Sequence, residues 1–267
     1  MTFDLGPALL FCPADRPERY AKAAERADAV ILDLEDAVAP RDKVAARETM
    51  LRHPADPDRT IVRINHAGTD DHELDLEAID STDYRYVMLA KTAGVRDLDR
   101  LEDYEVIALC ETAAGIVNAP AIAAVRCVVG LMWGAEDLVA SLGGSSSRSA
   151  DGRYRGVAAQ ARSSVLLAAG AHGKAAIDSV FLDIPDLDGL SAEATDAAAV
   201  GFTATACIHP NQVATIRAAY APTVDELDFA RDVLAAAEGE RGVFAFRGRM
   251  IDEPMLAHAR TVLSRAR

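Results

Sequence analysis

The sequence predicts an α/β fold, a (β/α)8 barrel of the TIM type with a C-terminal helical extension. Short apolar runs alternate with longer helix-like stretches, and the runs cover 8–13, 29–36, 60–65, 86–91, 105–111, 127–134, 176–184 and 204–210. They are continuously apolar, as in parallel strands buried on both faces. Eight such repeats favour a closed barrel. The alternative is an open doubly wound sheet, but no GxGxxG follows an early run.

Nearly every run ends in a polar or charged residue. The set comprises Arg16, Asp33, Glu35, Asp36, Arg63, Asn65, Lys91, Glu111, Asp137 and His209. In a barrel the active site lies at the carboxyl ends of the strands. Period-two geometry places Ile61, Arg63 and Asn65 on one face of their strand and Ile107, Leu109 and Glu111 on one face of theirs.

Glu111 closes one apolar run and Asp137 lies just past the next, and their spacing corresponds to about one strand–helix–strand unit of roughly 30 residues. Both carboxylates should therefore meet at one edge of the sheet. With no basic residue between them they would repel, and a hard divalent cation with oxygen ligands, Mg²⁺ first, would relieve this. The alternative is that both acids simply cap helices.

Several helical segments follow from capping and composition. A helix over 16–27 has Asp15 as its expected N-cap, and a second, over 44–53, follows a proline-containing turn. The Gly- and Ser-rich stretch 143–156 lacks the lysine of a P-loop. It is therefore expected to be a mobile loop beside the site rather than a phosphate cradle.

The barrel is expected over 1–221 and the extension over 222–267, within the same domain. The extension contains helix-like segments over 223–238 and 255–267, separated by a Gly-punctuated stretch. Asp252 precedes Pro254, and the plainest interpretation of its position is an N-cap of the last helix. We expect this extension to cover a site or to pack on a neighbouring subunit.

Composition excludes several classes of function. The formal net charge of −14 makes a nucleic acid or an anionic membrane an improbable partner. No run of about 18 apolar residues predicts a membrane span, and the first residues do not form a signal peptide. The four cysteines form no CxxC pair and indicate buried thiols of a cytoplasmic protein.

The chain resembles the citrate lyase β-subunit family of the HpcH/HpaI aldolase superfamily almost from end to end, and most resembles its stand-alone actinobacterial-type members. The matching segments, in order, are LFCPADRPERYAKA, ILDLEDAVAPRDKVAAR, IVRIN, ETAAGIVNAPAIA, GAEDLVASLGG, CIHPNQV and GRMIDEPMLAHA. One departure concerns the Leu-Pro-Lys-hydrophobic-Glu pattern after the fourth strand. Here residues 89–93 read Leu-Ala-Lys-Thr-Ala, which leaves fine substrate preference open.

The resemblance implies a homotrimer with particular site residues. Glu111 and Asp137 would bind Mg²⁺, with Mn²⁺ as a possible substitute, and Arg63 would bind the carboxylate of a keto acid. Asp252 would be an acid/base that acts across the subunit boundary, and Glu35 and Asp36 would be catalytic acids of uncertain role. Substrate would also contact Arg63, Glu111, Gly134, Ala135 and Glu136. Coenzyme A would contact Phe11, Arg16, Lys22, Ile208, His209 and Pro210.

The implied activity is a reversible Claisen-type cleavage of a 3-hydroxy-carboxyacyl-CoA of the citryl-, citramalyl- or malyl-CoA type. The products would be acetyl-CoA or propionyl-CoA and a 2-oxo acid such as oxaloacetate, pyruvate or glyoxylate. Three alternatives stay open: a β subunit acting on an acyl-carrier-bound citryl thioester, an aldolase acting on a free hydroxy-keto acid, and a barrel that binds CoA esters without catalysis.

Overall fold

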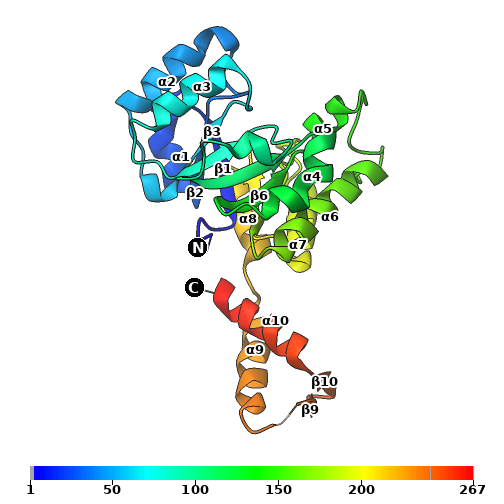
Figure 1. Cartoon of the computed structure of the whole chain (residues 1–267). Helices are drawn as coiled ribbons and strands as arrows, with labels where there is room; N and C mark the ends of the chain where they lie inside the picture. Colours follow the sequence, from blue (N-terminus) through cyan, green and yellow to red (C-terminus); the bar gives the residue numbers. More distant parts are fainter. Residues whose placement is uncertain (1–2, 241, 267) are drawn as a thin grey trace. The chain divides into compact units, whose positions relative to one another are not determined.

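The computed structural model describes residues 3–240 and 242–266, and the chain divides into two compact units at Ile216 and Arg217. The first unit contains a closed barrel of eight parallel strands in sequence order (Figure 1). The strands are β1 Ala8–Pro13, β2 Ala29–Asp33, β3 Thr60–Ile64, β4 Tyr86–Leu89, β5 Glu105–Cys110, β6 Val128–Trp133, β7 Ala175–Asp178 and β8 Ala204–Cys207. The predicted (β/α)8 barrel with a helical C-terminal part is confirmed.

Helices follow most of the strands. They are α1 Tyr20–Arg26, α2 Lys43–Arg52, α3 Asp70–Ile79, α4 Ala113–Ala123, α5 Ala135–Ser141, α6 Gly156–Ala171, α7 Leu187–Val200 and α8 Gln212–Tyr220. Between β4 and β5 the chain forms only the short 3-10 helix η4, Val95–Leu98. Three further 3-10 turns, η1 Pro17–Arg19, η2 Pro40–Asp42 and η3 Pro57–Arg59, each begin at a proline, whose fixed φ suits a first helical position.

Apolar side chains fill the barrel interior. Alternate strand residues such as Ile31, Ile61, Met88, Ile107 and Leu109 form one buried cluster, as expected for inward-facing layers of a TIM barrel. Leu109 and Glu111 both line a cavity above this cluster, so the predicted shared face of β5 is correct. The four cysteines are free and buried, as predicted.

Several predicted boundaries were wrong. The runs expected to end at 36, 184 and 210 leave the sheet at Asp33, Asp178 and Cys207, so their terminal polar residues lie in loops. The helix expected from residue 16 begins as η1, and no side chain caps η1 or α1, so Asp15 is not an N-cap. The strand β3 ends at Ile64, which lets the Asn65 side chain turn to Asp75 of α3 instead of sharing the face of Arg63.

The loop over 143–156, expected to be mobile, contacts neighbouring elements through Arg148 and Tyr154. Arg148 pairs with Glu193 of α7 at 2.8 and 3.0 Å and lies over the Tyr154 ring. Tyr154 in turn packs edge-on against the buried Trp133. The segment 143–156 is therefore anchored through α7 and β6.

The second unit contains α9 Val224–Ala237, the antiparallel pair β9 Phe244–Phe246 and β10 Arg249–Ile251, and α10 Glu253–Arg265. The helices α9 and α10 pack against each other around Ala230, Val233, Ile251, Ala259 and Val262. Asp252 caps α10 by accepting a hydrogen bond from the Met255 amide at 3.2 Å. The predicted domain limits at residues 221 and 222, and the packing of this unit on a neighbouring subunit, stay predictions.

Candidate active site

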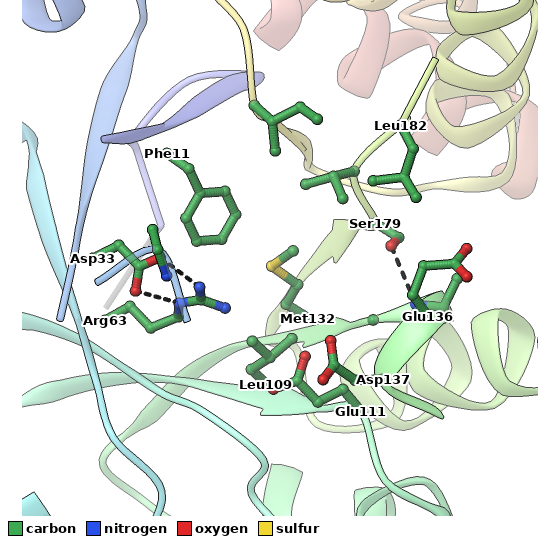
Figure 2. A pocket seen from close by; sticks show the side chains of 15 residues that line it. Phe11, Asp33, Arg63, Leu109, Glu111, Met132, Glu136, Asp137, Ser179 and Leu182 are labelled. Atoms are coloured by element: carbon green, nitrogen blue, oxygen red, sulfur yellow. Dashed lines mark hydrogen bonds and ion pairs between the residues drawn. The ribbon is translucent and has the colours of Figure 1, made fainter. Parts of the chain in front are cut away.

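The carboxyl ends of β1, β2, β3, β5 and β6 surround a cavity of about 240 Å³ (Figure 2). Its lining comprises Phe11, Asp33, Ala37, Arg63, Leu109, Glu111, Met132, Gly134, Ala135, Glu136, Asp137, Ser179, Val180, Leu182 and Ile208. Every residue predicted to bind metal or substrate is in this set. Figure 2 shows the Glu111 and Asp137 carboxylates side by side, across the cavity from the Arg63 guanidinium.

Strand geometry brings Glu111 and Asp137 together. Cys110 at the end of β5 is the register partner of Trp133 at the end of β6, so Glu111 and Gly134 leave the sheet at the same level. Gly134 is needed here, because a Cβ at this position would lie 2.7 Å from Glu111 Oε2. Asp137 then follows in the first turn of α5. Neither acid caps a helix, since Thr112 caps α4 and Gly134 precedes α5.

Glu111 lies in an environment that disfavours its charge. It is 3% exposed, and burial, followed by the charge of Asp137, raises its pKa to about 8. A nearby dication would offset both effects. Among the described residues, no group of three or more His, Cys, Asp or Glu side chains could hold a metal. Two carboxylates nevertheless suit Mg²⁺, which usually keeps several waters and takes further oxygens from the substrate.

Arg63 is held from behind by Asp33. The two residues are register partners of β2 and β3, and Arg63 Nε and Nη2 donate to the Asp33 oxygens at 2.8 and 2.5 Å. Arg63 Nη1 lies 3.3 Å from Glu35 Oε2, and the guanidinium stacks over Phe11 at 4.8 Å. Burial lowers the pKa of Arg63, but Asp33 and Glu35 outweigh it and the net shift is upward. A fixed cation thus faces the cavity.

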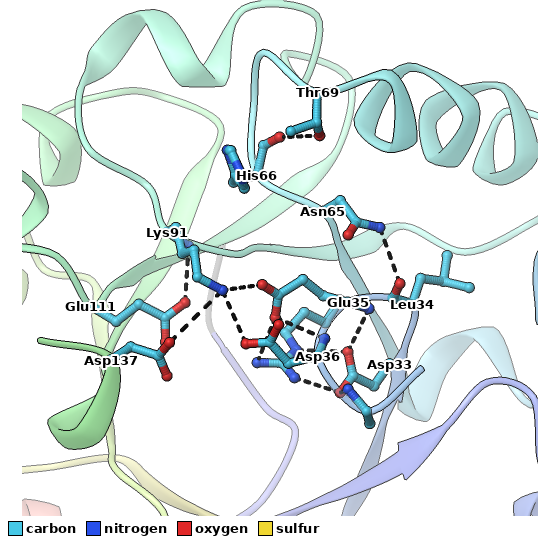
Figure 3. A network of polar contacts seen from close by, with 12 residues as sticks. Asp33, Leu34, Glu35, Asp36, Asn65, His66, Thr69, Lys91, Glu111 and Asp137 are labelled. Carbon is cyan, nitrogen blue, oxygen red and sulfur yellow. Dashed lines mark hydrogen bonds and ion pairs between the residues drawn. The ribbon is translucent and has the colours of Figure 1, made fainter. Parts of the chain in front are cut away.

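Lys91 contacts Glu35, Asp36, Glu111 and Asp137 (Figure 3), and the sequence did not predict these contacts. Its backbone N–H donates to Glu111 Oε1 at 3.0 Å, while its ammonium contacts Glu35, Asp36 at 3.0 Å and Asp137 at 3.8 Å. The expectation that no basic residue lies between the paired acids was therefore wrong. Its backbone adopts φ 51°, a left-handed conformation, which turns the amide and the side chain toward different acids.

Glu35 and Asp36 do not line the cavity but lie behind it. Burial raises the pKa of Glu35, against the opposing influence of Arg63 and Lys91. At Asp36 burial also opposes ionisation, but the Lys91 ammonium outweighs it and the pKa falls below its usual range. These contacts fit a role in orienting Arg63 and Lys91.

A second cavity, of about 560 Å³, shares Phe11, Ala37 and Ile208 with the first. It contains Lys22, His209 and Pro210, so five of the six residues expected to contact coenzyme A line it. Arg16 does not: its side chain lies 3.6 Å from Asp15 and is 55% exposed. The lining includes Arg19 in its place. Because η1 begins at Pro17, Arg19 lies one turn before Lys22, a signal available in the sequence.

The HpcH/HpaI aldolase/citrate lyase family model matches residues 8–210, which include both cavities. The chain belongs to this family. A citrate lyase subunit beta-like protein of Mycobacterium tuberculosis is 58% identical over 261 residues, covering 98% of this chain and 96% of the relative. The mitochondrial citramalyl-CoA lyase of Mus musculus is 31% identical over 294 residues, covering 97% and 85%.

Solved structures of the family agree with the fold. The crystal structure of protein CitE from Mycobacterium tuberculosis in complex with magnesium, acetoacetate and coenzyme A has a TM-score of 0.93 at 58% identity, and the match covers 98% of each chain. The predicted family is thereby confirmed. No helix among the described residues has the length and apolar character needed to cross a bilayer.

Asp252 belongs to the second unit, where its carboxylate caps α10. The cap uses Oδ1 as the acceptor for Met255 N. Sequence reasoning named both this structural role and a catalytic one. The capping role is observed, and the catalytic role remains a proposal.

Proposed function

We propose that this protein is a Mg²⁺-dependent carbon–carbon lyase that reversibly cleaves a 3-hydroxy-carboxyacyl-CoA of the citryl-, citramalyl- or malyl-CoA type. The products are acetyl-CoA or propionyl-CoA and a 2-oxo acid. The observation that carries the proposal is a single cavity in which Glu111 and Asp137 face Arg63. It adjoins a second cavity whose cations, Arg19 and Lys22, suit an anionic nucleotide.

In this proposal Arg63 binds the carboxylate of the substrate. Its Nε and Nη2 are oriented by Asp33, so the guanidinium keeps one geometry and can hold an anion with little loss of conformational entropy. A charge-assisted hydrogen bond of this kind is about twice as strong as a neutral one. Leu109, Met132 and Val180 line the same cavity and exclude water around the reacting carbons.

Glu111 and Asp137 would hold the Mg²⁺ ion. When bound, the ion would supply Lewis-acid polarisation of the hydroxyl or keto oxygen. Lys91 stabilises the arrangement from behind, because it contacts Glu111 through its amide and Asp137 through its ammonium. Mn²⁺, which also prefers oxygen ligands, should substitute.

Cleavage requires three changes that balance. The 3-hydroxyl gives its proton to a base and becomes the carbonyl of the 2-oxo acid, and the carbon–carbon bond breaks with its electron pair moving to the carbon beside the thioester carbonyl. That carbon then takes a proton from an acid. We assign this acid to Asp252, contributed by a neighbouring copy in a homotrimer, and in the synthetic direction its carboxylate removes the same proton. Such acid/base catalysis is typically worth 10²–10⁴-fold.

We place the enzyme in the cytoplasm.

The test is an assay of the purified protein with Mg²⁺ and citramalyl-, malyl-, methylmalyl- and citryl-CoA, with acetyl-CoA or propionyl-CoA measured by chromatography. We expect at least one substrate to be cleaved, with activity lost on chelation and in Asp137→Ala. Absence of the acyl-CoA product from all four would refute the proposal. Activity on only an acyl-carrier thioester would indicate a citrate lyase subunit, and activity on only a free hydroxy-keto acid an aldolase.

A further inference from the structure

Lys43, the first residue of α2, is a buried lysine that the reaction above does not use. Its side chain lies directly behind the loop that follows β2, and the residue is 8% exposed. Its ammonium donates to Leu34 O at 3.1 Å, to Glu35 O at 3.2 Å and to Asn65 Oδ1. A lysine has three N–H donors, so each of them has a partner here.

All three acceptors are neutral. Among the described residues no carboxylate forms an ion pair with Lys43, and Asp75 is linked to it only through Asn65, whose Nδ2 donates to Asp75 Oδ2 at 2.7 Å. The neighbouring cation on α2 behaves differently, since Arg47 pairs with Asp75 and Asp71 at 2.6 and 2.5 Å. A buried charge without a counterion is costly, and an apolar residue would cost less if Lys43 only filled space.

The three acceptors lie just past the carboxyl ends of β2 and β3, next to Arg63 and the acids that orient it. Leu34 and Glu35 follow β2, and Asn65 follows β3 just after Arg63. Leu34 N donates to Arg63 O of β3 at 2.9 Å. Asn65 Nδ2 donates to Leu34 O at 3.0 Å (Figure 3). Lys43 thus joins the two segments behind the site through three hydrogen bonds.

We propose that Lys43 is a positioning residue for the recognition of the 2-oxo acid. By holding the carbonyls of residues 34 and 35 against Asn65, it fixes the loop from which Glu35 reaches Arg63 Nη1. Without these hydrogen bonds the Glu35 loop moves and the guanidinium loses one of its two supporting acids. The proposal rests on the proposed function, because it names the ligand that the oriented Arg63 binds.

Lys43→Met, which removes the donors and keeps a similar length, tests the proposal, and Arg47→Lys is the matched control in the same polar network. Calorimetry on the full-length protein gives the Kd of pyruvate in the presence of Mg²⁺ and, separately, the Kd of coenzyme A. Hydrogen exchange of the metal-free protein reports the amides of residues 34–38. Thermal unfolding records the stability of both variants.

We expect Lys43→Met to weaken pyruvate binding by on the order of tenfold or more, since small misplacements of binding groups have effects of this size. Coenzyme A should bind within twofold of wild type, and exchange should quicken at residues 34–38. Arg47→Lys should lower the unfolding temperature but should alter neither the pyruvate affinity nor the hydrogen exchange at residues 34–38.

Equal pyruvate affinity in the wild type and Lys43→Met would overturn the inference, and so would equal weakening of both ligands. If the methionine variant does not fold, Lys43→Gln, which keeps two N–H donors, is judged by the same ratio. If the wild type does not bind pyruvate, the same comparison is made with oxaloacetate and glyoxylate. If it binds none of the three, the proposed function fails, and unchanged hydrogen exchange at residues 34–38 in Lys43→Met would then refute the role of Lys43 independently.

Discussion

Gly134 offers a direct test of the paired acids, because its replacement by alanine disturbs the packing against Glu111 without straining the backbone. Its φ and ψ are −124° and 120°, an extended conformation that alanine adopts without strain. The added Cβ would lie 2.7 Å from Glu111 Oε2 and 2.9 Å from Glu111 Cβ. Since ordinary contacts begin at 3.4 Å, Glu111 must move by about 0.5–0.7 Å.

The Glu111 Cβ is fixed to the backbone at the end of β5, so side-chain rotation alone cannot relieve the clash. Overpacking of this kind costs about 1–3 kcal/mol. If that energy appears as displacement of the Glu111 carboxylate, Mg²⁺ affinity falls about tenfold to a hundredfold, because 1.4 kcal/mol corresponds to a factor of ten. Titration with Mn²⁺ followed by electron paramagnetic resonance, and with Mg²⁺ by calorimetry, would measure this loss.

The control is Gly156→Ala at the start of α6, where an added Cβ meets nothing within 4 Å. It should leave metal affinity unchanged and should not lower stability, because alanine favours a helix more than glycine does. Metal binding by Gly134→Ala within twofold of wild type would refute the reasoning, because Glu111 would then either tolerate the displacement or not bind the ion.

Three further predictions follow from the site. Burial and Asp137 raise the pKa of Glu111 to about 8 from an ordinary value of 4.5, so between these pH values the folded metal-free protein holds a proton that the unfolded chain releases. The free energy of unfolding, measured with urea, should therefore fall from about pH 4.5 to 8, and Glu111→Gln should flatten this slope. A free energy that rises over the same range would contradict the assignment. Asp252→Asn should keep the α10 cap but lose 10²–10⁴-fold in turnover, whereas Asp252→Ala should also lose about 1 kcal/mol of stability; full activity of the asparagine variant rules out the acid/base role. Arg19→Ala and Lys22→Ala should each raise KM for the acyl-CoA with kcat little changed, and Arg16→Ala should do so less; the reverse order in steady-state kinetics would contradict the second cavity as the coenzyme A site.

The barrel could be predicted because its signals are local. The strands lie in apolar runs, and polar or charged residues stand at or just past the carboxyl end of most of them, as at Arg63 and Glu111. Two acids that closely follow consecutive parallel strands come to the same edge of the sheet. The pairing of Glu111 with Asp137 could therefore be predicted from their spacing and the expected strand–helix–strand topology.

Contacts between distant loops could not be predicted in the same way. Lys91 reaches Glu35 across 56 positions, and nothing in its own segment indicates the left-handed backbone that points it there. Asp33 was visible at the end of β2, but its pairing with Arg63 depends on the register of β2 and β3. The exact ends of β7 and β8 were missed because apolar residues continue into the following loops.

The wall common to the two cavities has a consequence for redesign. Phe11, Ala37 and Ile208 contact both spaces, so replacing any of them alters the fit of the thioester and of the small acid at once. Leu109 and Met132 border only the smaller space. Under the proposed function, a library of variants confined to Leu109 and Met132 should change which acyl group is accepted and leave coenzyme A binding unchanged.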